Sequence, residues 1–356
     1  MRILVDIGHP AHVHFFKNFI WEMGRRGHEP VVTARDKDVT LGLLKEYGIG
    51  HTVVGRMGKG RFDLIREWIG RDRKIYSIAR QFHPDVLTGI HNPCVAHVAR
   101  LTGAKSIIFT DSEPTKLADM VTFPFADVIC TPSCYKKDLG KKQVRYHGYH
   151  ELAYLHPNYF KPDPSVLQEA GLTRKDRFII MRFVAWQASH DIRQHGFNLE
   201  TKMRAVRELE KYARVFITSE KPLLGEFEKY RIPTSPEKIH DLLFYATLLI
   251  GDTQTMTTEA GILGTSAVRC NSFVGPNDMS NFIELEHNYD LLYSFREPDK
   301  AIEKALELLQ QPDLKGQWAK KRQRLLADKI DVTRFMVDFI ENYPDSFFRY
   351  GEVSKG

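Results

Sequence analysis

The stretch "RILVDIGHPAHVHFFKNFIWEMGRRG" (residues 2–27) decides the fold class of this 356-residue chain. Its first part, residues 2–8, is a short apolar run of the kind that forms a buried strand. A helical pattern follows over residues 13–27 and ends at Gly27, because glycine commonly terminates helices. One face of that helix is apolar and carries Val13, Phe16, Ile20 and Met23. The stretch therefore predicts a strand followed by an amphipathic helix, the first unit of a parallel sheet.

The same alternation of strand and helix continues to residue 148. Strand-like runs cover residues 29–35, 51–55, 84–90, 105–111, 126–132 and 143–148. Helical segments stand between several of them, at residues 41–48, within the basic stretch 55–80, and at 94–103. Strands separated by segments of helix length predict βαβ units and a parallel sheet covered on both faces.

A second alternation follows a break in the pattern. Residues 151–177 contain three prolines and no strand-like run, which is typical of a connection between domains. New strand-like runs then cover 178–183, 214–220, 247–252, 266–270 and 290–295, and the chain ends in helical segments at 299–311, 315–329 and 332–343. We expect two doubly wound Rossmann-like α/β domains that face each other across a cleft, over residues 1–165 and 166–330. Residues 331–356 are expected to form a C-terminal helix and tail that pack back on the first domain.

Composition and charge exclude several classes of protein. The chain is 42% hydrophobic and 27% charged, which is typical of a folded protein. Its apolar runs are shorter than the roughly 20 residues that cross a bilayer, and it begins directly with a strand, so we expect a cytoplasmic protein. The net charge of +6 is small, and no nucleic-acid-binding module is recognised, which disfavours nucleic acid as a partner.

Positive charge and aromatic side chains gather in residues 55–80. Such a stretch can contact anionic lipid at a membrane surface or a polyanionic substrate. A solvated helix face with its aromatic side chains packed inward explains the pattern equally well.

The most informative stretch of the second half is "LLIGDTQTMTTEAGILGTSAVRC" (residues 248–270). A buried strand is expected to end at Asp252, and a helix to begin near Thr255, with Thr253 and Thr255 as candidate caps. The free N–H groups of a helix start, together with the helix dipole, bind phosphate. Glu259 lies on the same face one turn further on and can accept hydrogen bonds from the two hydroxyls of a ribose. An ordinary helix cap, with an acidic residue near the positive end of the dipole, is the alternative.

This stretch resembles the nucleotide-sugar signature of GT-B-fold proteins, and in particular that of the non-hydrolysing UDP-N-acetylglucosamine 2-epimerases. Asp252, Thr253 and Glu259 agree with the pattern, whereas Gln254 and Thr255 replace two glycines. The resemblance implies that Thr253 lies at the phosphate and Glu259 at the ribose. The replaced glycines put in question how closely the backbone N–H groups approach the phosphates.

Two further resemblances extend over the chain. The segment "SPEKIHDLLFYATLLIGD" (residues 235–252) is similar to the uracil-binding segment of the GlcNAc transferase that makes lipid II, which implies that Ile239 contacts the base. The whole chain resembles an uncharacterised archaeal and bacterial family of unknown function in the same superfamily. The stretches that carry this likeness are "GHPAHVHFF" (8–16), "RFVAWQASHD" (182–191) and "GDTQTMTTEA" (251–260).

Three histidines in the first loop, His9, His12 and His14, require an explanation. The loop and helix are similar to those of many GT-B glycosyltransferases, in which a Gly-His pair precedes the helix. Counting back from the Arg-Gly-His at 26–28 places His12 at the position of the base in plant-type enzymes. A histidine can take a proton from an acceptor hydroxyl because its pKa lies near neutral pH. Capping or core packing is the alternative for His12, and we expect His9 and His14 to position the loop. A metal site is disfavoured because the three do not share one helical face.

Other candidates lie at predicted strand ends that face the expected cleft. Asp111 and Glu113 could orient His12, bind a sugar hydroxyl or act as acid and base, or they could cap the next helix. His150 and Glu151 could meet the donor or pack at the hinge. The side chains of Arg182, Ser189 and His190 could hold a diphosphate, since positive or hydrogen-bonding groups stabilise the charge of a leaving nucleotide.

Together these features favour a UDP-sugar-dependent glycosyltransferase of glycan or cell-envelope synthesis, inverting and without a metal or other cofactor. Its partners would be the nucleotide sugar and a glycan or lipid-linked acceptor, and a peripheral membrane contact is compatible with the basic stretch. One alternative is a 2-epimerase, which needs acid and base groups near C2 of the sugar, with Asp111 and Glu113 as the candidates. Another is a non-catalytic protein that binds sugar nucleotides.

Overall fold

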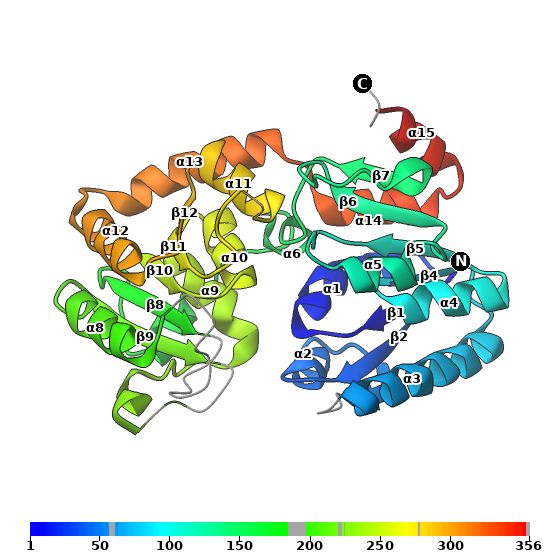
Figure 1. The fold of residues 1–356 in the computed structure, drawn as a ribbon, viewed down its shortest axis with the longest axis horizontal. Helices are drawn as coiled ribbons and strands as arrows, with labels where there is room; N and C mark the ends of the chain where they lie inside the picture. The colour runs from blue at the N-terminus through cyan, green and yellow to red at the C-terminus, as the bar shows by residue number, and fades with distance from the viewer. Residues whose placement is uncertain (57–60, 184–196, 220–222, 224, 277, 354–356) are drawn as a thin grey trace. The chain divides into compact units, whose positions relative to one another are not determined.

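The computed structural model describes residues 1–56, 61–183, 197–219, 223, 225–276 and 278–353. By its contacts the chain divides into two compact units, each described by itself (Figure 1). Unit 1 contains residues 1–159 and 329–356, and unit 2 contains residues 160–328. No helix in the described ranges has both the length and the apolar character needed to cross a membrane.

Unit 1 is built on a parallel sheet of seven strands in the order β3-β2-β1-β4-β5-β6-β7. The strands are β1 (Arg2–Ile7), β2 (Glu29–Asp36), β3 (His51–Arg56), β4 (Val86–Ile90), β5 (Lys105–Phe109), β6 (Val128–Pro132) and β7 (Gln143–Tyr146). The strand order reverses between β1 and β4, which pair in register from Ile3 opposite Val86 to Asp6 opposite Gly89. Ligands of doubly wound sheets bind at the carboxyl ends of the strands beside such a switch point.

Helices cover both faces of this sheet. On one face, α3 (Arg61–Phe82) contacts α4 (Pro93–Thr102), which contacts α5 (Lys116–Thr122). On the other, α1 (Pro10–Arg25) contacts α2 (Thr40–Glu46), α6 (Leu152–Leu155) and α14 (Val332–Glu341). The first core therefore lies between the sheet and α3 and α4, where Leu4, Leu87 and Ile108 pack against Ile75 and Val95.

The predicted strand and helix at the N-terminus are confirmed. In α1, the four predicted apolar side chains are all buried, and Gly27 has a φ of +81° that few other residues adopt without strain. The N–H of His28 closes this helix end on the carbonyl of Met23. The helix begins three residues earlier than the periodicity indicated, because Pro10 occupies its first turn and His9 caps it.

Residues at the C-terminus belong to unit 1. The helix α14 packs against α1, and α15 (Asp345–Val353) packs against β7. The hydroxyl of Thr333 in α14 donates to the carbonyl of Ala153 at 2.7 Å, and the amide of Asn18 in α1 donates to the same carbonyl at 2.8 Å. Three helices distant in sequence are thereby joined at one buried carbonyl group. The short helix η1 (Gly140–Lys142) precedes β7.

Unit 2 is built on a parallel sheet of five strands in the order β12-β11-β10-β8-β9. The strands are β8 (Phe178–Phe183), β9 (Arg214–Ser219), β10 (Leu248–Gly251), β11 (Ser266–Cys270) and β12 (Leu292–Phe295). Its helices are α7 (Ser165–Glu169), α8 (Leu199–Leu209), α9 (Ile239–Tyr245), α10 (Thr255–Leu263), α11 (Ser280–His287), α12 (Pro298–Gln310) and α13 (Leu314–Asp328), with η2 (Gly225–Tyr230) and η3 (Pro236–Lys238). The switch point of this sheet lies between β8 and β10. The predicted class, two doubly wound α/β domains with parallel sheets, is confirmed.

Candidate functional site

The three histidines of the first loop have three different environments. The Nδ1 of His9 accepts the N–H of Ala11 at 3.2 Å and so caps α1. His14 is buried among aromatic side chains, with its ring centroid 5.4 Å from that of Tyr154 and its Nδ1 3.3 Å from the hydroxyl of Tyr47. Only His12 lies at the carboxyl end of β1 with neither a capping role nor a place in the core. Within the described residues, no group of three His, Cys, Asp or Glu side chains is placed to hold a metal ion.

His12 is a neutral histidine with one ring nitrogen already bonded. Burial lowers its pKa well below 6.5, and the nearby His9 and His150 add to the shift. The Nδ1 of His12 accepts the backbone N–H of Gly8 at 3.3 Å. A neutral ring that accepts at Nδ1 carries its proton on Nε2, so in this arrangement Nε2 is a donor. To act as a base at Nε2, His12 must give up the Gly8 hydrogen bond, at a cost of about 1 kcal/mol.

Asp111 lies beside His150 in this structure. Its Oδ2 is 3.4 Å from the Nδ1 of His150, which joins the loop after β5 to the segment after β7. A carboxylate at Nδ1 leaves the lone pair of Nε2 as the basic position. The Nε2 of His150 is enclosed and has no hydrogen-bond partner among the described residues, and burial lowers the pKa of this histidine although Asp111 opposes the shift.

Glu113 and Glu151 are held differently. The Oε1 of Glu113 accepts the N–H of Lys136 at 2.8 Å, so this carboxylate ties the loop after β5 to the loop after β6. Neither Asp111 nor Glu113 caps the next helix, because α5 has Thr115 at its cap position. Glu151 is buried at the start of α6. Of the predicted residues in unit 1, the structure thus pairs Asp111 with His150 and places Glu113 in a separate contact.

A charged cluster at the switch point of unit 1 was missed from the sequence. Asp6 is fully buried within β1, and its carboxylate accepts hydrogen bonds from Thr33, Arg71 and Asn92, each at 2.5 Å. Asn92 also caps α4 by accepting the N–H of Cys94 at 3.0 Å. The predicted strand gave no sign of this pairing, since a single acid in an apolar run can also face solvent at a strand end.

Arg71 and its neighbour Glu67 change the interpretation of the basic stretch. Arg71 points from α3 to Asp6, and Glu67 forms two hydrogen bonds to Arg35 of β2 at 2.5 and 2.6 Å. These two charged side chains of α3 are therefore internal, and the helix is not solvated along its whole charged surface.

In unit 2, the strand end and helix start occur where the sequence predicted them. The strand β10 ends at Gly251, and α10 begins at Thr255. A Cβ atom at Gly251 would lie 1.9 Å from the carbonyl oxygen of Arg182, so only glycine allows β8 and β10 to approach here. The predicted caps are wrong, because Gln254 occupies the cap position and no side chain caps the helix. The carbonyl of Thr253 instead accepts the hydroxyl of Thr257 at 2.7 Å.

Glu259 lies one turn into α10 and is buried with a histidine partner. The Nε2 of His240, on α9, is 2.9 Å from the Oε1 of Glu259, and both side chains are almost fully buried. The pair fixes the predicted ribose ligand in one orientation. His240 was not predicted to matter, although it follows Ile239 in the segment that the resemblance had already indicated.

The remaining predicted residues of unit 2 are distributed along its strand ends. The guanidinium of Arg182, at the end of β8, donates to the hydroxyl of Thr218 on β9 at 3.1 Å. Ile239 is the first residue of α9 and is partly buried. Ser189 and His190 lie outside the described residues.

The fold defines a class of protein. The two doubly wound parallel units are those of the GT-B fold, as comparison with solved structures shows. UDP-GlcNAc 2-epimerase from Neisseria meningitidis, bound to UDP-GlcNAc, matches 96% of this chain and 99% of its own with a TM-score of 0.67 and 11% identity. The glycosyltransferase SsfS6 of Streptomyces sp. SF2575, complexed with thymidine diphosphate, matches 94% of this chain and 99% of its own with a TM-score of 0.60 and 13% identity.

Within this class the chain belongs to the family described as "Protein of unknown function (DUF354)", whose model matches residues 1–345. A related sequence, the uncharacterized protein MJ0665 of Methanocaldococcus jannaschii, is 22% identical over 283 residues, in an alignment that covers 76% of this chain and 82% of that protein.

Proposed function

We propose that this protein is a glycosyltransferase that uses a UDP-sugar and inverts the configuration at the anomeric carbon. The observation that supports the proposal best is the Glu259–His240 pair beside the switch point of unit 2. A buried carboxylate held by a histidine, one turn into a helix that follows a parallel strand, suits the two hydroxyls of a ribose. The helix N-terminus one turn away suits the diphosphate. The GT-B neighbours include proteins whose structures contain UDP-GlcNAc or thymidine diphosphate.

The reaction we propose is a single displacement. The acceptor hydroxyl gives its proton to a base, and its oxygen forms a bond to the anomeric carbon. The bond from that carbon to the diphosphate oxygen breaks, and UDP leaves as an anion. Arg182 and the first N–H groups of α10, with Thr253 beside them, would stabilise the negative charge that develops on the diphosphate. We propose no metal or other cofactor in this step.

Two histidines compete for the role of base. His12 is partly exposed, but its Nδ1 is occupied by the Gly8 N–H. His150 has the Asp111 carboxylate at Nδ1, but its Nε2 is enclosed. We propose His12 as the group that touches the acceptor, with His150 and Asp111 as positioning residues behind it. Asp111→Asn should then lower kcat and change its pH profile while leaving UDP affinity unchanged, whereas His12→Ala should abolish transfer.

The donor site is tested by calorimetric titration with UDP, GDP, dTDP and CMP. We expect preference for UDP and a loss of about tenfold to a hundredfold in Glu259→Gln, since a hydrogen bond to a charged group contributes about 1.5–3 kcal/mol. Glu286→Gln is the matched control, because Glu286 is also a partly buried acid of unit 2 and accepts the N–H of Ser294. Equal affinity in all three proteins, with unchanged thermal unfolding, would refute the donor site.

A 2-epimerase is the second candidate, and the Asp111–His150 pair favours it. Inversion at C2 requires one group that removes a proton from one face of the sugar and another that returns a proton to the opposite face, and Asp111 and His150 are two such titratable groups. Incubation with UDP-GlcNAc in the absence of an acceptor separates the two functions. A C2 epimer detected by NMR would replace our proposal, whereas release of free UDP only when an acceptor glycan is present would support transfer. Nucleotide binding without either product would point to a non-catalytic protein.

A further inference from the structure

Large apolar side chains are exposed on α5, just after it, and at the end of α4. The helices α3, α4 and α5 lie side by side on one face of the first sheet (Figure 1). Leu117 and Met120 of α5 are 76% and 70% exposed, and Phe125 just after the helix is 46% exposed. Leu101, at the end of α4, is 69% exposed. Phe125 packs edge-on against His97 of α4, which lies one turn before Leu101, so the segment after α5 lies against α4.

The polar side of α5 faces inward. The carboxylate of Asp119 accepts the hydroxyl of Thr115 at 2.9 Å and pairs with Lys137 at 2.5 Å and His91 at 3.0 Å. A surface helix normally buries its apolar side chains and exposes its polar ones. In α5 the acid Asp119 points inward whereas Leu117 and Met120 are exposed, so packing on the sheet does not account for these two apolar side chains.

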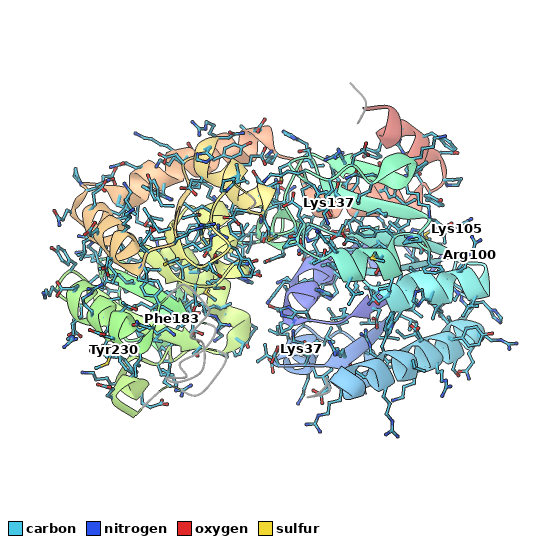
Figure 2. All side chains as sticks on the ribbon, in the orientation of Figure 1. Lys37, Arg100, Lys105, Lys137, Phe183 and Tyr230 are labelled. Atoms are coloured by element: carbon cyan, nitrogen blue, oxygen red, sulfur yellow. The ribbon has the colours of Figure 1, made fainter. Side chains whose placement is uncertain are left out.

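The acidic and basic side chains of this face also differ in their surroundings. Its described acids are engaged: Glu67 with Arg35, Asp72 with His97, and Asp119 as above. Six basic side chains of the same three helices are exposed, whereas Arg71 is internal. The six are Arg66, Arg73, Lys74, Arg80, Arg100 and Lys116. Arg100, on α4, is labelled in Figure 2. We call the exposed side chains of α3, α4, α5 and Phe125 the basic-apolar face.

We infer that the basic-apolar face docks on a bilayer that contains anionic phospholipid. Exposed basic groups around protruding apolar side chains match lipid headgroups with acyl chains beneath them. A protein partner is disfavoured because charged residues, lysine above all, are depleted in the core of protein interfaces. On this face the five exposed large apolar side chains, which include Ile69, share the three helices with six exposed basic ones. The phosphates of a nucleic acid could pair with the basic side chains, but they would offer no apolar surface to the leucines and the methionine, which would stay exposed to water. The inference goes beyond the proposed function, since it requires no nucleotide.

Vesicle flotation tests the docking with the full chain and no sugar nucleotide. We expect binding to phosphatidylcholine vesicles that contain phosphatidylglycerol, weaker binding in high salt, and little binding to phosphatidylcholine alone. The variant Arg73→Gln/Lys74→Gln should lower the partition coefficient by about 25-fold, since each basic residue near an anionic surface contributes about fivefold. The variant Leu117→Ser/Met120→Ser should lower it by about tenfold or more.

Matched controls come from unit 2. Phe273→Ser removes an apolar side chain that is 61% exposed, and Lys300→Gln/Lys320→Gln removes two exposed charges, so both should bind vesicles like the unchanged protein. Failure of the unchanged protein to bind anionic vesicles would overturn the inference, as would equal loss in the controls. A change in the mass of the vesicle-free protein in Leu117→Ser/Met120→Ser would instead show that the face joins two copies of the chain. UDP titration of the same variants, expected unchanged, separates this outcome from failure of the donor site.

Discussion

Replacing Asp6 by asparagine should destabilise unit 1 by about 3–5 kcal/mol. Asp6 is 0% exposed, and its partner Arg71 has a side chain that is 11% exposed, so the pair is buried. Removing one member of a buried ion pair costs about 3–5 kcal/mol because the other charge is left without compensation. The asparagine amide adds to this, because its NH2 group replaces one carboxylate oxygen and faces either the Thr33 hydroxyl at Oδ1 or the N–H groups of Arg71 and Asn92 at Oδ2. In a domain of this size the midpoint of thermal unfolding should fall by about 6–20 °C.

Native-state hydrogen exchange with mass spectrometry measures this loss unit by unit. Peptides from β1 should lose protection in Asp6→Asn, whereas peptides from β10 serve as the internal control in unit 2. Thr33→Val, which removes one hydrogen bond and no charge, should cost only about 1 kcal/mol. The double variant Asp6→Leu/Arg71→Met should be more stable than Asp6→Asn, because no charge is left alone. If Asp6→Asn lies within about 1 kcal/mol of the unchanged protein, or the double variant is the least stable, the reasoning about this pair is wrong.

Two further predictions concern the last residue of β10 and the loop after β1. Gly251→Ala should cost about 3 kcal/mol or more, because the new Cβ meets the backbone of Arg182; Gly225→Ala, with open space around its Cβ, should be nearly neutral in the same thermal unfolding assay. Burial lowers the pKa of His9 from 6.5 to about 4. As the pH falls, the unfolded chain therefore binds a proton at this histidine before the folded chain does. The stability that depends on neutral His9 is present above pH 6.5 and is lost as the pH falls toward 4. His9→Asn keeps a capping side chain and should make denaturant midpoints less dependent on pH in this range; an unchanged slope would contradict the assignment.

The positions of strands and helices could be predicted from the sequence because local patterns determine them. The apolar runs that predicted strands correspond to the twelve described strands. The helix α10 was predicted to begin near Thr255, and it begins at that residue. The capping of α10 was not, since Thr253 and Thr255 are both good caps in isolation. Which of them caps a helix depends on the backbone angles of the loop, and here Gln254 takes the position. The sequence around α5 also gives no local signal for the orientation of this helix. Its Asp119 points inward because it pairs with His91 and Lys137, which belong to other loops.

The partners of the site residues were beyond the reach of sequence reasoning. Several roles were open for Asp111 from the sequence, and its contact with His150 was not among the predictions; Glu259 was recognised, but its partner His240 was not. Apolar periodicity is a local property, so the sequence by itself determined the fold class, the strand ends and the candidate residues on them. Pairing between side chains depends on sheet order and register, which bring distant strand ends to one edge. For that reason only the tertiary structure decided which acid meets which histidine, and that Asp6 in the first strand holds Arg71.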